Sequence, residues 1–168
     1  KPHLNRRQEL VRYALEHGHA LRLLNEAVRI ARRNRLSHVL GEVLVTRGAV
    51  LHELGRMSAA RRDFDAAEPL VPPDTVAELT SQRATLFANQ GDLVSAASLY
   101  ARLLKDGTLT AEVRFKAATN LGILQAHRGR FHDSLALFDV ASSAAEQVSP
   151  LYVALVDWVV RNTLPPPS

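Results

Sequence analysis

Four glycines recur at nearly constant intervals, and this regular spacing constrains the fold more than any other feature of the sequence. Gly18, Gly55, Gly91 and Gly129 are separated by steps of 37, 36 and 38 residues. An apolar segment of about helix length precedes each glycine, and a second such segment follows it. A period in the thirties with one turn glycine per unit is typical of stacked helical hairpins. The spacing therefore predicts an all-α solenoid, an architecture that usually presents a surface to a partner.

The predicted units follow from the helical spacing of the apolar residues and from the turn signals between them. The first hairpin is expected to pair a helix over 4–17 with one over 20–33, turning at Gly18. Ser149 and Pro150 suit the cap and first turn of a last helix. One domain spanning 1–168 would then contain repeats at about 4–36, 41–74, 75–107 and 110–148, a C-terminal helix at 150–162 and a Pro-rich exit at 164–168.

Composition argues against several kinds of site. The 168 residues include no cysteine, which excludes disulfides, thiolate metal sites and a cysteine nucleophile within them. Every turn glycine is single, so no glycine-rich phosphate loop is present, and the seven histidines show no metal-ligand spacing. We predict no catalytic residue, cofactor or metal. The longest apolar stretch is too short to span a membrane, and the chain, which starts at Lys1 without a signal peptide, is expected to be a piece of a cytoplasmic protein.

Positive charge is concentrated at the start of the chain. Residues 1–36 carry nine basic and three acidic side chains, although the whole chain has a net charge of only +4. Several of these arginines close a predicted helix, where the helix dipole favours cations. Binding of an anion or a nucleic acid through this Arg-rich first hairpin stays open as an alternative function.

Small and aromatic residues recur within the units at matching places. The second unit has Gly48, Leu51, Ala60, Phe64 and Pro72, and the third has Ala84, Phe87, Ala96 and Tyr100. The fourth unit has Gly122, Gly129, Ser134 and Phe138. This pattern resembles the tetratricopeptide repeat (TPR) family. The resemblance implies a right-handed α-solenoid of about four helical hairpins plus a C-terminal helix, acting as a protein-interaction scaffold.

A narrower resemblance rests on longer runs. It is carried by Phe64-Asp65-Ala66-Ala67-Glu68-Pro69-Leu70, Ala77-Glu78-Leu79, Gln82-Arg83-Ala84, Asn120-Leu121-Gly122 and Arg128-Gly129. These runs are similar to the N-terminal TPR regions of bacterial, actinomycete-type CHAT-domain caspase-like proteins. The resemblance implies a regulatory or target-sensing region whose cysteine peptidase module lies outside this chain. A TPR part of a transcriptional regulator or ATPase would look similar.

In the TPR family, the first helix of each hairpin lines a concave groove that holds a protein or peptide. Amides and hydroxyls on such a wall can bind the backbone of an extended peptide or a partner helix. The alternative is a solvated groove that holds no ligand. The residues that the resemblance places in the groove are Thr46, His52, Gln82, Thr85, Asn89, Lys116, Asn120 and His127.

The last predicted helix is apolar nearly all round, whereas a terminal repeat usually has a polar outer face. We therefore expect a docking or dimer surface at Tyr152, Leu155, Trp158 and Val159. Its partner would be further repeats, a second domain or a second copy of the chain. The alternative is a helix that folds completely into the fourth hairpin.

Overall fold

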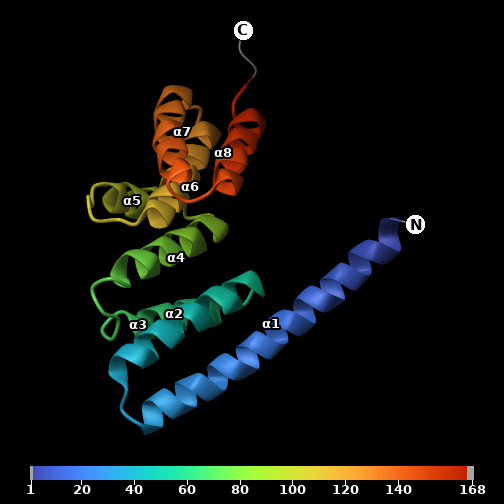
Figure 1. Cartoon of the computed structure of the whole chain (residues 1–168), viewed down its shortest axis with the longest axis vertical. Helices are drawn as coiled ribbons and strands as arrows, with labels where there is room; N and C mark the ends of the chain where they lie inside the picture. The colour runs from blue at the N-terminus through green and yellow to red at the C-terminus, as the bar shows by residue number, and fades with distance from the viewer. Residues whose placement is uncertain (1, 166–168) are drawn as a thin grey trace. The chain divides into compact units, whose positions relative to one another are not determined.

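The computed structural model describes the backbone of residues 2–165 and the side chains of residues 16–165. Within this part of the chain, the structure consists of α-helices packed as successive antiparallel pairs (Figure 1), so the all-α prediction is confirmed. The helices are α1 (Pro2–Arg33), α2 (Ser37–Glu53), α3 (Met57–Ala67), α4 (Val76–Asn89), α5 (Leu93–Leu104), α6 (Ala111–His127), α7 (Phe131–Glu146) and α8 (Pro150–Thr163).

The chain divides into two compact units, which are described separately. Unit 1 comprises residues 1–79 and unit 2 comprises residues 80–168. The arrangement of both units as a single solenoid domain stays a prediction. Of the predicted Pro-rich exit, residues 166–168 lie outside the described residues.

The predicted first hairpin is wrong, because α1 continues through Gly18 as one helix of 32 residues. Gly55, Gly91 and Gly129 have φ values of +73°, +84° and +74°, the left-handed conformation that ends a helix, whereas Gly18 is helical. A glycine within a helix costs only about 1 kcal/mol relative to alanine, so it does not force a turn. The three turn glycines are each followed, two residues later, by a large apolar residue, but Gly18 is followed by Ala20, which has little apolar area to hold a turn closed.

Unit 1 contains the hairpin of α2 and α3, and α1 packs against α2. A Cβ atom added to Gly48 would lie 2.7 Å from Cδ1 of Phe64 and nearer still to Cε1. The small residue in α2 therefore lets the helix approach the buried phenyl ring of α3. Ala60 and Ala67, one turn on either side of Phe64, are fully buried as well. The helix α2 begins at Ser37, before the predicted start of this repeat at 41.

Unit 2 repeats this packing. Ala84 of α4 and Tyr100 of α5 are both buried, and a Cβ on Gly122 of α6 would lie 2.8 Å from Cε1 of Phe138 in α7. In all three hairpins the small residue precedes the aromatic residue by 16 positions. The hydrogen-bonded caps are Asp92 before α5 and Thr110 before α6.

The last helix, α8, packs against both α6 and α7. Val156 of α8 joins a core formed by one phenylalanine and several alanines of α6 and α7. Pro150 occupies the first turn of α8 as predicted, although the Ser149 side chain makes no capping hydrogen bond.

Candidate protein-docking surfaces

Two of the predicted groove residues meet at Tyr100, which is buried in unit 2. Asn120 Nδ2 donates to the Tyr100 hydroxyl at 3.1 Å, and this hydroxyl lies 2.7 Å from Thr85 Oγ1. Thr85 Oγ1 also donates to the carbonyl oxygen of Ser81 at 3.1 Å. Since the threonine has one hydroxyl proton, Tyr100 donates to Thr85 in this chain of hydrogen bonds. Burial raises the pKa of Tyr100, while the bonds from Thr85 and Asn120 oppose the rise.

This network gives Thr85 and Asn120 a structural role. Their polar atoms connect α4, α5 and α6 through one buried hydroxyl, and buried hydroxyls need such partners. A peptide backbone in the predicted groove would compete with these internal bonds. The two residues therefore hold the wall of unit 2 together.

The other predicted groove residues of unit 2 differ widely in exposure. Lys116 Nζ lies 2.9 Å from Glu112 Oε1 one turn earlier, and this lysine is the main cause that lowers the pKa of Glu112. Asn89 and His127 are exposed, and Gln82 is half-buried.

In unit 1, the two predicted groove residues have no shared contact among the described hydrogen bonds. Thr46 is exposed and donates to the carbonyl oxygen of Glu42 at 3.0 Å. His52 is buried, and burial is the main cause that lowers its pKa, with the neighbouring Glu53 acting in the opposite direction. The partner-binding groove as a whole stays a prediction.

The outer face of α8 carries three large apolar side chains. Leu151, Leu155 and Trp158 are 75%, 45% and 60% exposed, and their spacing of four and three residues places them on one face of the helix. We call these three residues the α8 stripe. Leu155 and Trp158 were predicted as docking residues from the sequence, whereas Leu151 was not among them.

The other two predicted docking residues of α8 face the interior. Val159 is only 8% exposed. The Tyr152 ring is half-buried and meets Phe115 edge to face at a centroid distance of 4.7 Å, and its hydroxyl donates to Glu112 Oε1 at 3.3 Å. The contacts of Tyr152 fasten α8 to the α6–α7 hairpin, so this residue helps to orient the helix that carries the stripe.

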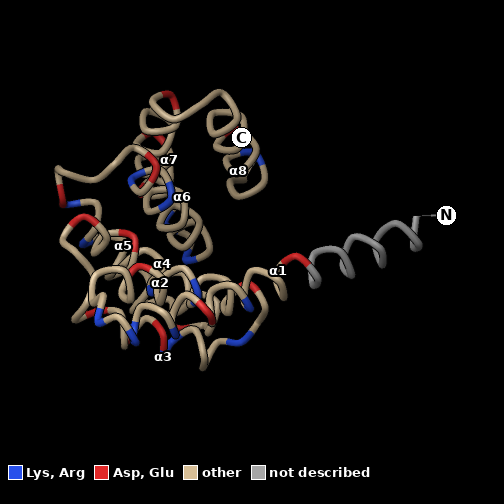
Figure 2. Tube along the Cα trace, turned by 60° about the horizontal axis from the view of Figure 1, so that its bottom comes forward, with Lys and Arg blue, Asp and Glu red and all other residues tan. Residues whose placement is uncertain are grey.

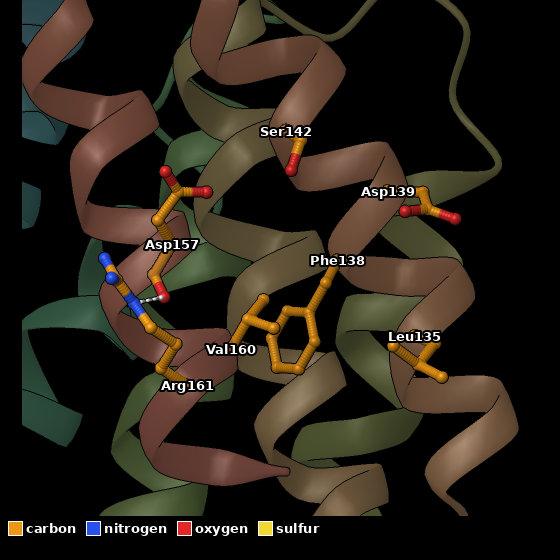
Figure 3. A pocket seen from close by; sticks show the side chains of 7 residues that line it. All are labelled: Leu135, Phe138, Asp139, Ser142, Asp157, Val160 and Arg161. Atoms are coloured by element: carbon orange, nitrogen blue, oxygen red, sulfur yellow. Dashed lines mark hydrogen bonds between the residues drawn. The ribbon is translucent and has the colours of Figure 1, made fainter. Parts of the chain in front are cut away.

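An open pocket of about 430 Å³ lies between α7 and α8, on a different face of α8 from the stripe. Phe138 and Val160 lie between the two helices, and carboxylates come from both sides, Asp139 from α7 and Asp157 from α8 (Figure 3). The guanidinium of Arg161 turns back along its own helix, where Nε donates to the Asp157 carbonyl oxygen at 3.1 Å. Leu135 and Ser142 complete the lining. The sequence contained no signal for this pocket, because its residues meet only when α8 folds against α7.

Two arginines in the described part of α1, Arg22 and Arg29, contact side chains of their own helix, and both blue and red segments occur along this part in Figure 2. Arg29 forms a two-bond pair with Glu26, and Arg22 Nη2 lies 2.8 Å from His19 Nδ1. These contacts engage part of the positive charge within the helix.

Within residues 16–165, no three histidine, aspartate or glutamate side chains gather in a way that could hold a metal ion. None of the described helices has the length and apolar character needed to cross a membrane. Comparison with known protein families and with curated proteins finds no match to this chain.

Proposed function

We propose that this chain is a protein-interaction module of TPR-like hairpins and that the α8 stripe is its docking surface. The observation that carries the proposal is the exposure of Leu151, Leu155 and Trp158 on one face of a helix whose opposite face is fixed in the core of unit 2. Clustered exposed apolar side chains typically mark a binding surface. Tryptophan is also among the residue types most enriched at positions that dominate binding energy.

The expected occupant is the apolar face of a partner helix. A helix that presents apolar residues every three to four positions would fit along a stripe with the spacing of Leu151, Leu155 and Trp158. The charges beside the stripe are mixed, because Arg161 lines the neighbouring pocket together with Asp139 and Asp157, so the apolar stripe and not net charge selects this partner.

The TPR-like, right-handed solenoid arrangement is part of this proposal. It is supported by the small residue and the aromatic ring that recur 16 positions apart in three hairpins. A regulatory region of a larger cytoplasmic bacterial protein, including one with a CHAT peptidase module, is compatible with such a scaffold and stays a hypothesis.

A displayed library of random peptides tests the docking surface, because it samples many candidate partner sequences at once. We expect selected peptides to lose binding to a Leu155→Glu variant, because docking would bury the new carboxylate without a partner. Val94→Glu is the matched control, since Val94 is also an exposed apolar residue of a unit 2 helix. Peptides that bind both variants equally would contradict the proposal.

Trp158, the only tryptophan of the chain, supplies a second readout. A docked peptide should shift its fluorescence to the blue, because the indole leaves water. The alternative function, anion binding by residues 1–36, should leave this emission unchanged. The affinity for the anion should also fall steeply between about 50 and 200 mM salt.

A further inference from the structure

The turn between α1 and α2 carries positive charges that no acidic side chain engages. The helix α1 ends at Arg33, α2 begins four residues later, and all residues from 32 to 39 are exposed. Within the described part of the chain, four basic side chains at this turn make no hydrogen bond or ion pair, namely those of Arg32, Arg33, Arg35 and His38. These side chains are therefore available to a negatively charged partner.

The helix dipole accounts for only part of this charge. Arg32 and Arg33 lie in the last turn of α1, where cations are favoured. His38 lies in the first turn of α2, where a positive charge is disfavoured, and that turn has neither an acidic residue nor a side-chain cap. Arg35 has a φ of +56°, a conformation that favours the glycine found at the three hairpin turns. Basic residues thus occupy two positions at which they do not stabilise the fold.

Two aliphatic side chains are exposed among these charges. Leu36, in the turn, is 46% exposed, and Val39 is 45% exposed. Side chains of an α-helix tilt toward its N-terminus, so Val39, in the first turn of α2, leans toward the turn. Figure 1 shows this turn at the lower left, where α1 ends. We call Arg32, Arg33, Arg35, Leu36, His38 and Val39 the α1–α2 tip.

Acidic residues limit the net charge at this end of unit 1. A Cβ on Gly41 would lie 2.9 Å from backbone atoms of Leu70 and Val71, so the segment after α3 runs beside the start of α2. Glu68 and Asp74 belong to this segment, and Glu68 has an interaction partner within the chain. Charge alone should therefore attract a partner only weakly, and a partner that also buries the aliphatic side chains fits the tip better.

We propose that the α1–α2 tip binds the surface of an anionic lipid bilayer. The arginines would pair with lipid phosphates, while Leu36 and Val39 would enter the boundary between headgroups and acyl chains. This mode of binding requires no membrane-spanning helix. The proposal concerns a surface of unit 1 and does not depend on the α8 stripe.

The composition of the tip favours a lipid surface over a nucleic acid. Single strands are held largely by stacking of bases on aromatic rings, and residues 32–39 include no phenylalanine, tyrosine or tryptophan. A nucleic acid contacted through its phosphates would leave Leu36 and Val39 in water. A bilayer takes up both the charged and the aliphatic side chains.

Flotation with lipid vesicles tests the charged part of the tip. We expect the chain to float with vesicles of phosphatidylserine and phosphatidylcholine in about equal amounts, and to bind pure phosphatidylcholine much more weakly. Each basic residue near an anionic surface strengthens binding roughly fivefold, so Arg33→Gln/Arg35→Gln should weaken it more than about tenfold. Arg56→Gln/Arg62→Gln is the matched control, because it removes the same charge from exposed positions elsewhere in unit 1.

The aliphatic part has its own variant. Leu36→Ser/Val39→Ser should weaken vesicle binding severalfold without changing its salt dependence, since no charge is altered. Serine is a favoured N-cap residue, so the start of α2 at position 36 should be retained. Circular dichroism of each variant verifies that the helices are intact.

An introduced cysteine locates the contact directly. The chain has no cysteine of its own, so Leu36→Cys supplies a single thiol for a fluorophore that shifts to the blue when it leaves water. Anionic vesicles should produce this shift at position 36 and not in Val94→Cys, on an exposed position of unit 2.

Several results would overturn the proposal. A chain that does not bind the anionic vesicles at low salt has no such surface, and equal losses in the two arginine variants would reduce the effect to net charge. If Leu36→Ser/Val39→Ser binds as tightly as the unmodified chain while a short DNA duplex competes for the same arginines, the tip is a phosphate site for nucleic acid. Loss of vesicle binding in Leu155→Glu would place the lipid contact on α8 instead.

Discussion

The α2–α3 hairpin of unit 1 and the α6–α7 hairpin of unit 2 share an apolar contact but differ in the polar groups beside it. In both, a glycine of the first helix lies under a phenyl ring of the second, Gly48 under Phe64 and Gly122 under Phe138. In unit 2, the buried Ser134 hydroxyl donates to the Gly122 carbonyl oxygen at 2.8 Å.

In unit 1, an ion pair lies beside the same contact. Arg47, next to Gly48, donates to both carboxylate oxygens of Asp63 at 2.7 Å, and its third bond goes to Asn25 of α1 at 3.0 Å. The hydrogen bonds with Asp63 raise the pKa of Arg47. The glycine–phenyl contact is therefore common to both hairpins, while the polar group beside it differs: Ser134 bonds within its own hairpin, whereas Arg47 also bonds to the preceding helix, α1.

The largest expected effect tests the shared contact. Gly48→Ala should lower the free energy of unfolding by about 2–3 kcal/mol, because the buried Phe64 ring cannot move away from the added methyl group. Gly122→Ala should cost less, since its Cβ would lie farther from the ring. Urea unfolding followed by circular dichroism measures both. The double variant Gly48→Ala/Phe64→Leu should regain part of this lost stability. If Gly48→Ala alone is as stable as the unmodified chain, the contact between residue 48 and the ring is not close.

The next effect concerns the Arg47–Asp63 ion pair beside the glycine–phenyl contact of the α2–α3 hairpin. Asp63→Asn should cost about 2 kcal/mol, because it leaves the largely buried Arg47 guanidinium without its charged partner. Asp65→Asn is the matched control on the same helix, where the exposed pair with Arg61 is 3.9 Å long and contributes at most about 1 kcal/mol. Equal losses in thermal denaturation of the two variants would mean that the buried pair has no special role.

A third experiment compares two glycines of the repeating set. Gly129→Ala should lower stability by about 1–2 kcal/mol, because its φ of +74° is unfavourable for a residue with a Cβ. Gly18→Ala should instead raise helix content and stability by up to about 1 kcal/mol, since Gly18 is inside a helix. Chemical unfolding of both variants checks the opposite signs. A loss of stability in Gly18→Ala would indicate that residue 18 forms a turn after all.

The smallest expected effect comes from a substitution that makes the α4–α5 hairpin resemble the other two. Tyr100→Phe replaces the ring that bonds Thr85 and Asn120 with the phenyl group found at positions 64 and 138. We expect a loss of about 1 kcal/mol from the broken buried bonds. Tyr152→Phe, which removes only an exposed bond to Glu112, should cost less. A neutral Tyr100→Phe would mean that the polar network is dispensable.

Much of the local structure could be predicted because its signals are local. The helices from α2 to α8 follow apolar spacing, and the turns at Gly55, Gly91 and Gly129 lie where the sequence predicts them. A glycine between two apolar segments is nevertheless compatible with a helix or with a turn. Gly18 differs from the three turn glycines in the second residue after it, which is Ala20 and not a large apolar residue, so a turn at this point gains little from burial.

The candidate sites were harder to predict. Val159 and Trp158 are adjacent and both apolar, yet one is buried in unit 2 and the other faces outward. Spacing places residues on faces of a helix, but it does not reveal which face another helix will cover. Thr85 and Asn120 resembled free groove residues for the same reason, since their shared partner Tyr100 belongs to a different helix.

The sequence by itself determined where α2 to α8 run and where the chain turns at Gly55, Gly91 and Gly129, because these follow from periods of a few residues and from backbone conformation. Only the tertiary structure decided that α1 is continuous, that Thr85 and Asn120 are engaged internally, and that the α8 stripe and the α7–α8 pocket are open. Those properties depend on which helix faces are covered, and coverage is set by contacts between residues distant in the chain.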